Sequence, residues 1–107
     1  MTRLDPISLA RSFLFVPASR PERFAKALTS GAGAVIIDLE DAVALEAKPA
    51  AREQLAQAWA GFTAPERARL LVRVNAAGTP WHFDDLQLVA NLAAEGLGGV
   101  VLPKAET

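Results

Sequence analysis

The sequence predicts an α/β fold in which four parallel strands alternate with three helices. Short apolar runs of strand length alternate with longer alanine- and leucine-rich stretches at helical spacing. Glycine or proline separates each stretch from the next. A helix between successive strands implies a parallel sheet with right-handed crossovers. The chain has 107 residues and is 51% hydrophobic, so it holds at most one domain with a packed core.

The first half of the chain is expected to hold two strands and two helices. The first strand covers 12–16 and stops at Pro17, and the first helix covers 21–29 with a proline at its start. The second strand covers 34–39 and is nearly all apolar, as in a strand that is covered on both faces. The second helix runs from about 49 to 60, and a glycine follows it.

The second half is expected to repeat this alternation. A third strand covers 70–75, a turn covers 78–80, a third helix covers 82–95 and a fourth strand covers 100–102. The helical period assigns four inward positions to the third helix: Leu86, Val89, Leu92 and Ala93. The residues alone leave two architectures open, a small open sheet and part of a (β/α)₈ barrel, since a whole barrel needs about 250 residues.

Composition and charge exclude several classes of function. Eleven basic residues against twelve acidic ones give a net charge of −1, which argues against a nucleic-acid-binding protein. The absence of cysteine excludes disulfides and thiolate metal sites, and the single histidine, His82, excludes a zinc site built from several imidazoles. No targeting or membrane segment is recognisable, so we expect a cytoplasmic protein that binds no membrane.

Candidate site residues follow the strands, because ligands of parallel α/β folds gather at the carboxyl ends of the strands. Asp38 and Glu40 alternate along one extended segment and therefore point to the same side. Two such carboxylates suit a hydrated Mg²⁺ ion or a catalytic role; the alternative is a solvated loop. Arg73 ends an apolar strand and needs an anionic partner, which is either one of these carboxylates or a substrate.

A basic cluster follows the first strand, at or near the start of the first helix. It consists of Arg20, Arg23 and Lys26. Such a cluster suits phosphate groups, and the alternative is an ordinary solvated helix face, which we prefer for Arg23. His82 has no partner at useful spacing, so helix capping or surface packing is its simplest role.

Four ordered motifs resemble the HpcH/HpaI aldolase and citrate lyase β-subunit family. Together they cover nearly the whole chain, in the order typical of the family. They are RSFLFVP at 11–17 with SRP at 19–21, DLEDAV at 38–43 followed by Lys48 and Ala51-Arg52, VRVN at 72–75, and LPK at 102–104. The resemblance implies a (β/α)₈ barrel that makes or breaks a carbon–carbon bond beside a thioester or keto acid, with Mg²⁺ as cofactor.

The resemblance also implies roles for six residues. Arg73 holds carboxylate or carbonyl oxygens of the substrate, and Asp38 and Glu40 are acidic catalytic residues that act near the metal through its waters. Three further residues contact the thioester: Phe15, Arg20 and Lys26. The direct metal ligands of the family lie on later strands, so we expect them beyond Thr107.

Residues 1–107 are therefore expected to form the N-terminal portion of such a barrel: its first four parallel strands and three helices. The expected substrate is a hydroxyacyl thioester of CoA or of acyl-carrier protein, such as a citryl-, malyl- or citramalyl-thioester. We expect the isolated chain to be inactive and the full-length protein to be a homo-oligomer. Two alternatives stay open: a pyruvate-dependent aldolase of hydroxy keto acids in the same family, and a non-catalytic α/β association module.

Overall fold

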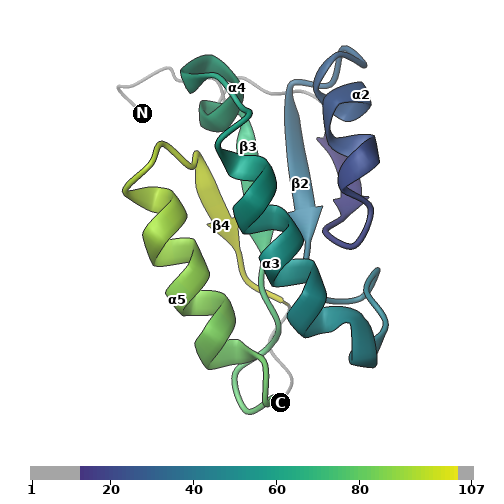
Figure 1. Cartoon of the computed structure of the whole chain (residues 1–107), viewed down its shortest axis with the longest axis vertical. Helices are drawn as coiled ribbons and strands as arrows, with labels where there is room; N and C mark the ends of the chain where they lie inside the picture. Colours follow the sequence, from purple (N-terminus) through teal and green to yellow (C-terminus); the bar gives the residue numbers. More distant parts are fainter. Residues whose placement is uncertain (1–12, 104–107) are drawn as a thin grey trace.

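The computed structural model describes residues 13–103 of the chain. One sheet contains four strands in the order β1-β2-β3-β4, and every neighbouring pair is parallel (Figure 1). The strands are β1 (Phe13–Pro17), β2 (Ala34–Asp38), β3 (Leu70–Arg73) and β4 (Gly99–Val101). The α-helices are α2 (Phe24–Leu28), α3 (Lys48–Trp59), α4 (Ala64–Ala68) and α5 (His82–Ala93), and short 3-10 turns, η1 (Pro21–Arg23) and η2 (Leu45–Ala47), precede α2 and α3.

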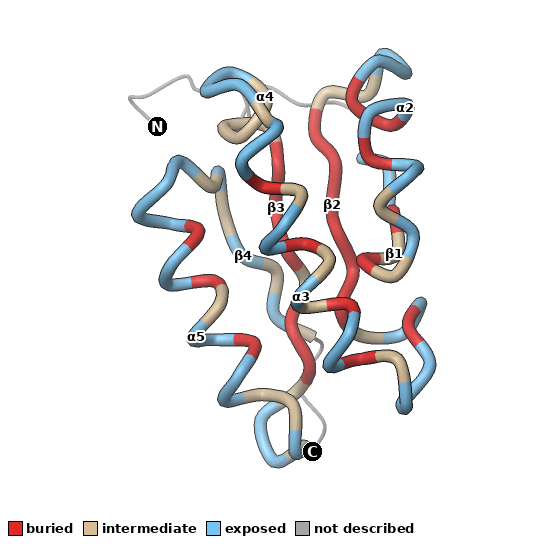
Figure 2. The backbone as a smooth tube through the Cα atoms, in the orientation of Figure 1, coloured by how far each residue is buried: buried red, intermediate tan, exposed pale blue. Residues whose placement is uncertain are grey.

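The helices α2, α3 and α5 all cover the same face of the sheet (Figure 1). The main core lies between them and the sheet. Its largest side chain is Trp59, which packs edge-on against Phe62 at a centroid distance of 5.6 Å. In Figure 2 the buried residues form continuous stretches along β2 and β3 and recur once per turn on α3 and α5. Helices on one face only are typical of a (β/α)₈ barrel, whereas a doubly wound sheet has helices on both faces.

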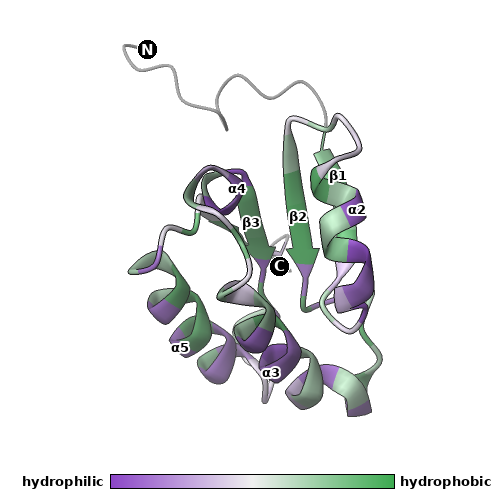
Figure 3. Ribbon diagram, turned by 45° about the horizontal axis from the view of Figure 1, so that its top comes forward, coloured by the Kyte–Doolittle hydropathy of each residue, from purple (hydrophilic) through white to green (hydrophobic). Residues whose placement is uncertain are grey.

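The opposite face of the sheet carries the alternate residues of each strand. A small second cluster of Ala34, Ile36 and Leu71 is buried there. Phe13 and Phe15 on the edge strand β1 are each 49% exposed. In Figure 3, β2 and β3 are hydrophobic along their length and become hydrophilic where they end. The polar end of this face is where the site residues lie.

The predicted fold class, four parallel strands with three helices of a barrel, is confirmed. The element ends agree within two residues when the 3-10 turn η1 is counted as the start of the first helix. Helix α4 was not predicted. Thr63 and Glu66 form a reciprocal capping box at its start, and Pro65 lies in its first turn. Two inward positions of α5 are wrong: Leu86 is 41% exposed and Ala93 is exposed, whereas Asp85 is buried. In the part of the chain described, no helix is both long and apolar enough to span a bilayer.

Candidate functional site

Asp38 and Arg73 form the centre of the candidate site. They end the neighbouring strands β2 and β3 and are register partners across the ladder. The Arg73 guanidinium donates two hydrogen bonds to the two carboxylate oxygens of Asp38, from Nε at 3.0 Å and from Nη2 at 2.7 Å. Asp38 is buried, while 23% of the Arg73 side chain is exposed. The pair is thus a bidentate ion pair, the strongest geometry between these groups, open to solvent on the arginine side.

The Asp38 carboxylate also organises the loop that follows it. The backbone N–H groups of Glu40 and Ala42 donate to its two oxygens, at 2.8 and 3.0 Å. Burial by itself raises the pKa of Asp38, but the hydrogen bonds from Arg73 and from these two amides outweigh burial and hold the pKa below its usual value. Asp38 therefore stays ionised while it accepts four hydrogen bonds.

Glu40 lies beside the same arginine but has the opposite pKa shift. Its Oε1 is 3.4 Å from Arg73 Nε, and its side chain is 21% exposed. Burial and the neighbouring charge of Asp41 raise the pKa of Glu40, and the charge of Arg73 only partly offsets them. Two carboxylates two residues apart are thus set to differ in proton affinity, which is typical of sites that handle protons.

Phe15 completes the surroundings of Arg73 from β1. The guanidinium carbon lies 5.0 Å from the centroid of the Phe15 ring, within cation–π distance. Arginine has five N–H donors, and Asp38 accepts from two of them. No described residue accepts from Nη1, so that end of the guanidinium is available to an anionic ligand.

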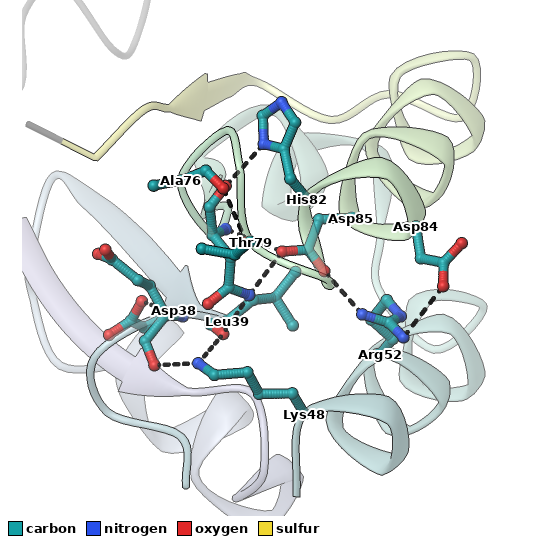
Figure 4. Close-up of polar contacts among 11 residues, drawn as sticks. Asp38, Leu39, Lys48, Arg52, Ala76, Thr79, His82, Asp84 and Asp85 are labelled. Carbon is teal, nitrogen blue, oxygen red and sulfur yellow. Dashed lines mark hydrogen bonds and ion pairs between the residues drawn. The ribbon is translucent and has the colours of Figure 1, made fainter. Parts of the chain in front are cut away.

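A second polar network lies beneath the loop that carries Glu40 (Figure 4). The Lys48 ammonium donates to the backbone carbonyls of Leu39 and Glu40, at 3.0 and 2.7 Å. The side-chain amide of Asn75, just after β3, donates to the same Leu39 carbonyl at 2.9 Å. The loop after β2 is thus fixed from α3 on one side and from β3 on the other.

Asp85 of α5 closes this network. Its carboxylate is fully buried and accepts from the backbone and side-chain N–H groups of Asn75, at 2.8 and 2.6 Å, and from Arg52 of α3 at 3.0 Å. Nδ1 of His82 lies 2.7 Å from the Asn75 carbonyl, so His82 has a structural role at the start of α5. The network joins α3, α5, β3 and the loop into one rigid unit.

The structure brings Asp38, Glu40, Arg73 and Phe15 together, and among the described contacts neither Arg20 nor Lys26 pairs with Asp38, Glu40 or Arg73. Arg20 is largely exposed and lies 3.8 Å from Glu22. Lys26 of α2 and Phe15 both line a groove of about 300 Å³ along β1. Lys104 of the fourth motif lies outside the described residues.

Sequence reasoning missed the contacts that Lys48 and Asp85 make around the loop. The motif that contains Lys48 was recognised, but its spacing does not reveal which atoms the ammonium binds. Asp85 did carry a signal, because it lies four and seven residues before the buried Val89 and Leu92 and so shares their face of α5. A carboxylate on a buried helical face requires a partner, and Asn75 and Arg52 supply it.

The carboxylates of this site do not form a metal centre by themselves. Within residues 13–103, no three Asp, Glu, His or Cys residues are grouped so that they could hold a metal ion. Asp38 already accepts four hydrogen bonds, and Mg²⁺ needs oxygen ligands that are free to bind it. Glu40 has only the longer contact to Arg73 among the described side chains.

Comparison with known proteins identifies relatives along the whole described region. The model of the HpcH/HpaI aldolase/citrate lyase family matches residues 11–107. A citrate lyase subunit beta-like protein of Mycobacterium tuberculosis is 47% identical over 95 residues, which are 89% of this chain and 32% of the relative. An L-malyl-CoA/beta-methylmalyl-CoA lyase of Rhodobacter capsulatus is 34% identical over 99 residues, which are 92% of this chain and 31% of the relative.

Solved structures agree with these matches. The M. tuberculosis protein CitE in complex with magnesium, acetoacetate and coenzyme A superposes with a TM-score of 0.68 at 45% identity, over 92% of this chain and 34% of that one. The citrate lyase beta subunit of the same organism, with oxaloacetate and magnesium, gives a TM-score of 0.71 at 42% identity, over 97% of this chain and 43% of that one. The chain spans about one third of the length of the curated relatives it matches.

Proposed function

The chain belongs to the HpcH/HpaI aldolase/citrate lyase family, and from that premise we propose that it provides the substrate-carboxylate site of a carbon–carbon lyase acting on a hydroxyacyl thioester. The observation that carries this proposal is the Arg73 guanidinium, which Asp38 holds at Nε and Nη2 and whose Nη1 donates to no residue within 13–103. A planar guanidinium with two adjacent free N–H groups matches a carboxylate or keto-acid oxygen pair.

In the proposed reaction the substrate's hydroxyl group loses its proton and becomes a carbonyl as the carbon–carbon bond breaks. The electrons of that bond pass to the acyl fragment as an enolate, which then takes up a proton. Arg73 would hold the carboxylate of the keto fragment and the alkoxide oxygen that becomes its carbonyl. Asp38 fixes the orientation of Arg73, and Glu40, whose pKa is raised, is the group suited to exchanging a proton with the reacting atoms or their waters.

Mg²⁺ is part of the proposal as the cofactor of the family reaction, since relatives are crystallised with it. The described residues do not fit a direct coordination shell, as the occupied oxygens of Asp38 show. We therefore place Asp38 and Glu40 around the ion through water and expect its direct ligands elsewhere. The 107-residue chain by itself is then expected to bind Mg²⁺ weakly and to catalyse no turnover.

The thioester is assigned to the β1 side of the site. Phe15 contacts Arg73 and also lines the groove that the basic residues Arg23 and Lys26 line, so this groove adjoins the arginine through Phe15. That surface suits an acyl chain that leads to a phosphate-bearing carrier, either CoA or acyl-carrier protein. This continuity favours the thioester over the alternative of a pyruvate-dependent aldolase that acts on a small hydroxy keto acid.

Binding of pyruvate tests the carboxylate site directly. Titration of pyruvate into ¹⁵N-labelled chain is expected to shift the Arg73 Nε–Hε resonance in a saturable way, and the Arg73→Met variant is expected to lose all saturable shifts. Arg67→Met is the matched control, because the Arg67 guanidinium donates to the carbonyls of Trp59 and Glu95 and contacts no residue of the proposed site. Identical titrations of the parent chain and Arg73→Met would show that the arginine binds no carboxylate and would overturn the proposal.

A turnover assay tests whether the residues of this chain suffice for catalysis. The purified 107-residue chain is incubated with Mg²⁺ and citryl-, malyl- or citramalyl-CoA, and release of the acyl-CoA product is measured. We expect no turnover above the buffer control. Turnover that disappears in Arg73→Ala would show that these residues suffice for catalysis and that our account of the metal is wrong.

A further inference from the structure

Lys48 is a buried cation at the first position of α3. Only 4% of the residue is exposed, although lysine is almost never buried without partners. No described carboxylate forms an ion pair with it. Its partners are two backbone carbonyls, those of Leu39 and Glu40, and the face of the Trp81 ring, whose centroid lies 5.3 Å from Nζ.

The two carbonyls belong to the loop that carries the acidic site residues. Consecutive carbonyls do not turn to the same point in an extended strand, so binding both of them to one ammonium bends the chain immediately after β2. The N–H groups of Glu40 and Ala42 then face the carboxylate of Asp38. Lys48 thus holds the carbonyls of this loop while Asp38 holds its amides, as Figure 4 shows for the lysine side.

We propose that Lys48 is a positioning residue of the site: it acts on Asp38 and Glu40 through the backbone of the loop and so determines where they meet Arg73. The inference rests on the proposed function only in taking Arg73 and its two carboxylates as the site. Lys48 touches none of the three side chains. The alternative is that its methylene chain and charge merely stabilise the start of α3.

The test compares Lys48→Met with Lys48→Arg. Methionine keeps the length and the apolar packing of the side chain but cannot donate to the carbonyls, whereas arginine keeps the charge and the donors. Gln57→Met is the matched control, because it introduces methionine at an exposed position of the same helix. The unfolding free energy of each variant is measured with urea, so that loss of stability is separated from loss of local order.

Two spectroscopic readouts report on the site without any ligand. Amide exchange of Glu40 and Ala42 is expected to accelerate roughly tenfold or more in Lys48→Met, while the amide of Val35, inside β2, changes no more than the global stability does. The Nε–Hε resonance of Arg73 is expected to shift or broaden, while that of Arg69, whose Nε donates to a carbonyl far from the loop, stays in place. Lys48→Arg is expected to restore both signals.

Two other results for Lys48→Met would overturn the proposal. If all amides of Lys48→Met accelerate together, or if this variant does not fold, Lys48 supports the whole fold and not the site in particular. If the Arg73 resonance and the two loop amides are unchanged in a folded Lys48→Met chain, Asp38 alone fixes the loop. Failure of pyruvate to bind would contradict the proposed function but would leave these ligand-free signals unaffected, so the two failures are distinguishable.

Discussion

Two arginines at opposite ends of β3 show how position in a parallel sheet decides what a charge does. Arg69 precedes the strand, and its guanidinium donates to three backbone carbonyls, those of Leu28, Ala32 and Gly33. Arg73 ends the strand, and its guanidinium is held by carboxylates and an aromatic ring. The two residues are four positions apart in sequence yet have entirely different surroundings.

The difference follows from which groups each end of the sheet offers. At the amino ends of the strands, Arg69 meets the turn that links α2 to β2, where carbonyls need donors and no side chain is charged. Because its donors are bound to these carbonyls, the Arg69 guanidinium stabilises the fold and is not available to a ligand. At the carboxyl ends, one bidentate carboxylate satisfies Arg73 and leaves Nη1 unused within the described region, so this charge remains available to a ligand.

The largest expected loss of stability comes from breaking the ion pair between Asp38 and Arg73. Asp38→Asn removes a buried negative charge that four hydrogen bonds satisfy, and it leaves Arg73 without its main partner. We expect the unfolding free energy in urea at pH 7 to fall by about 3–5 kcal/mol. The loss should shrink as pH falls, because the lowered pKa of Asp38 means that its stabilisation is present above the unfolded-state pKa and is lost as pH falls through the folded-state pKa. An undiminished loss at pH 3 would contradict this account.

The second prediction concerns the other end of β3. Arg69→Met leaves three carbonyls without a charged donor, and we expect it to lower the unfolding free energy by about 2–3 kcal/mol. Pyruvate binding by the folded variant should be unchanged, because Arg69 lies at the end of the sheet away from the site. If this variant loses pyruvate binding while it stays folded, the two arginines are not functionally separate.

Arg73→Lys sharpens the comparison at the site end. Lysine keeps the positive charge but cannot make the paired hydrogen bonds or stack on Phe15, so the substitution is not conservative here. We expect a stability loss of only about 1–2 kcal/mol, smaller than for Arg69→Met, together with loss of saturable pyruvate binding. The reverse order of effects, with intact binding and the larger loss of stability, would make Arg73 a structural residue like Arg69.

The sequence predicted the strands and the meeting of Asp38 with Arg73 for a simple reason. Alternation along strands and the shared carboxyl end of a parallel sheet are local rules, and two polar residues at the ends of adjacent strands must lie close together. The partners of Lys48 and of Arg69 were not predictable, because both side chains bind backbone carbonyls. Every residue has a carbonyl, so no residue type in the sequence marks these partners.

Helix α5 shows a different limit. The spacing of its apolar residues correctly identified Val89 and Leu92 as buried. The same spacing assigned Leu86 to the core, but Leu86 is exposed and Asp85 is buried. A hydrophobicity pattern ranks a carboxylate last among candidates for burial. It fails here because Asn75 and Arg52 make a polar site inside the helix–sheet interface. Such a buried polar network is visible only when residues far apart in sequence are seen together.

The smallest expected effect is a gain in unfolding free energy, in contrast to the losses above. It distinguishes Glu40 from Asp38, the other carboxylate of the site. Burial and the charge of Asp41 raise the pKa of Glu40, so its ionisation on folding is unfavourable. Its contribution to stability is fully present below the unfolded-state pKa and is lost as pH rises through the folded-state pKa. Glu40→Gln should therefore be more stable than the parent chain at pH 7, by less than about 1 kcal/mol, and equal to it near pH 3.

Urea unfolding of Glu40→Gln and of Asp38→Asn across pH 3–7 measures both signs in one series. Relative to the parent chain, the first variant gains stability as pH rises and the second loses it, because the carboxylates two residues apart have opposite pKa shifts. Glu53→Gln, an exposed change on α3, is the matched control for the substitution itself. Parallel profiles for the two site variants would mean that Asp38 and Glu40 share one environment, and Glu40 would then lose its assignment as the proton-exchanging group.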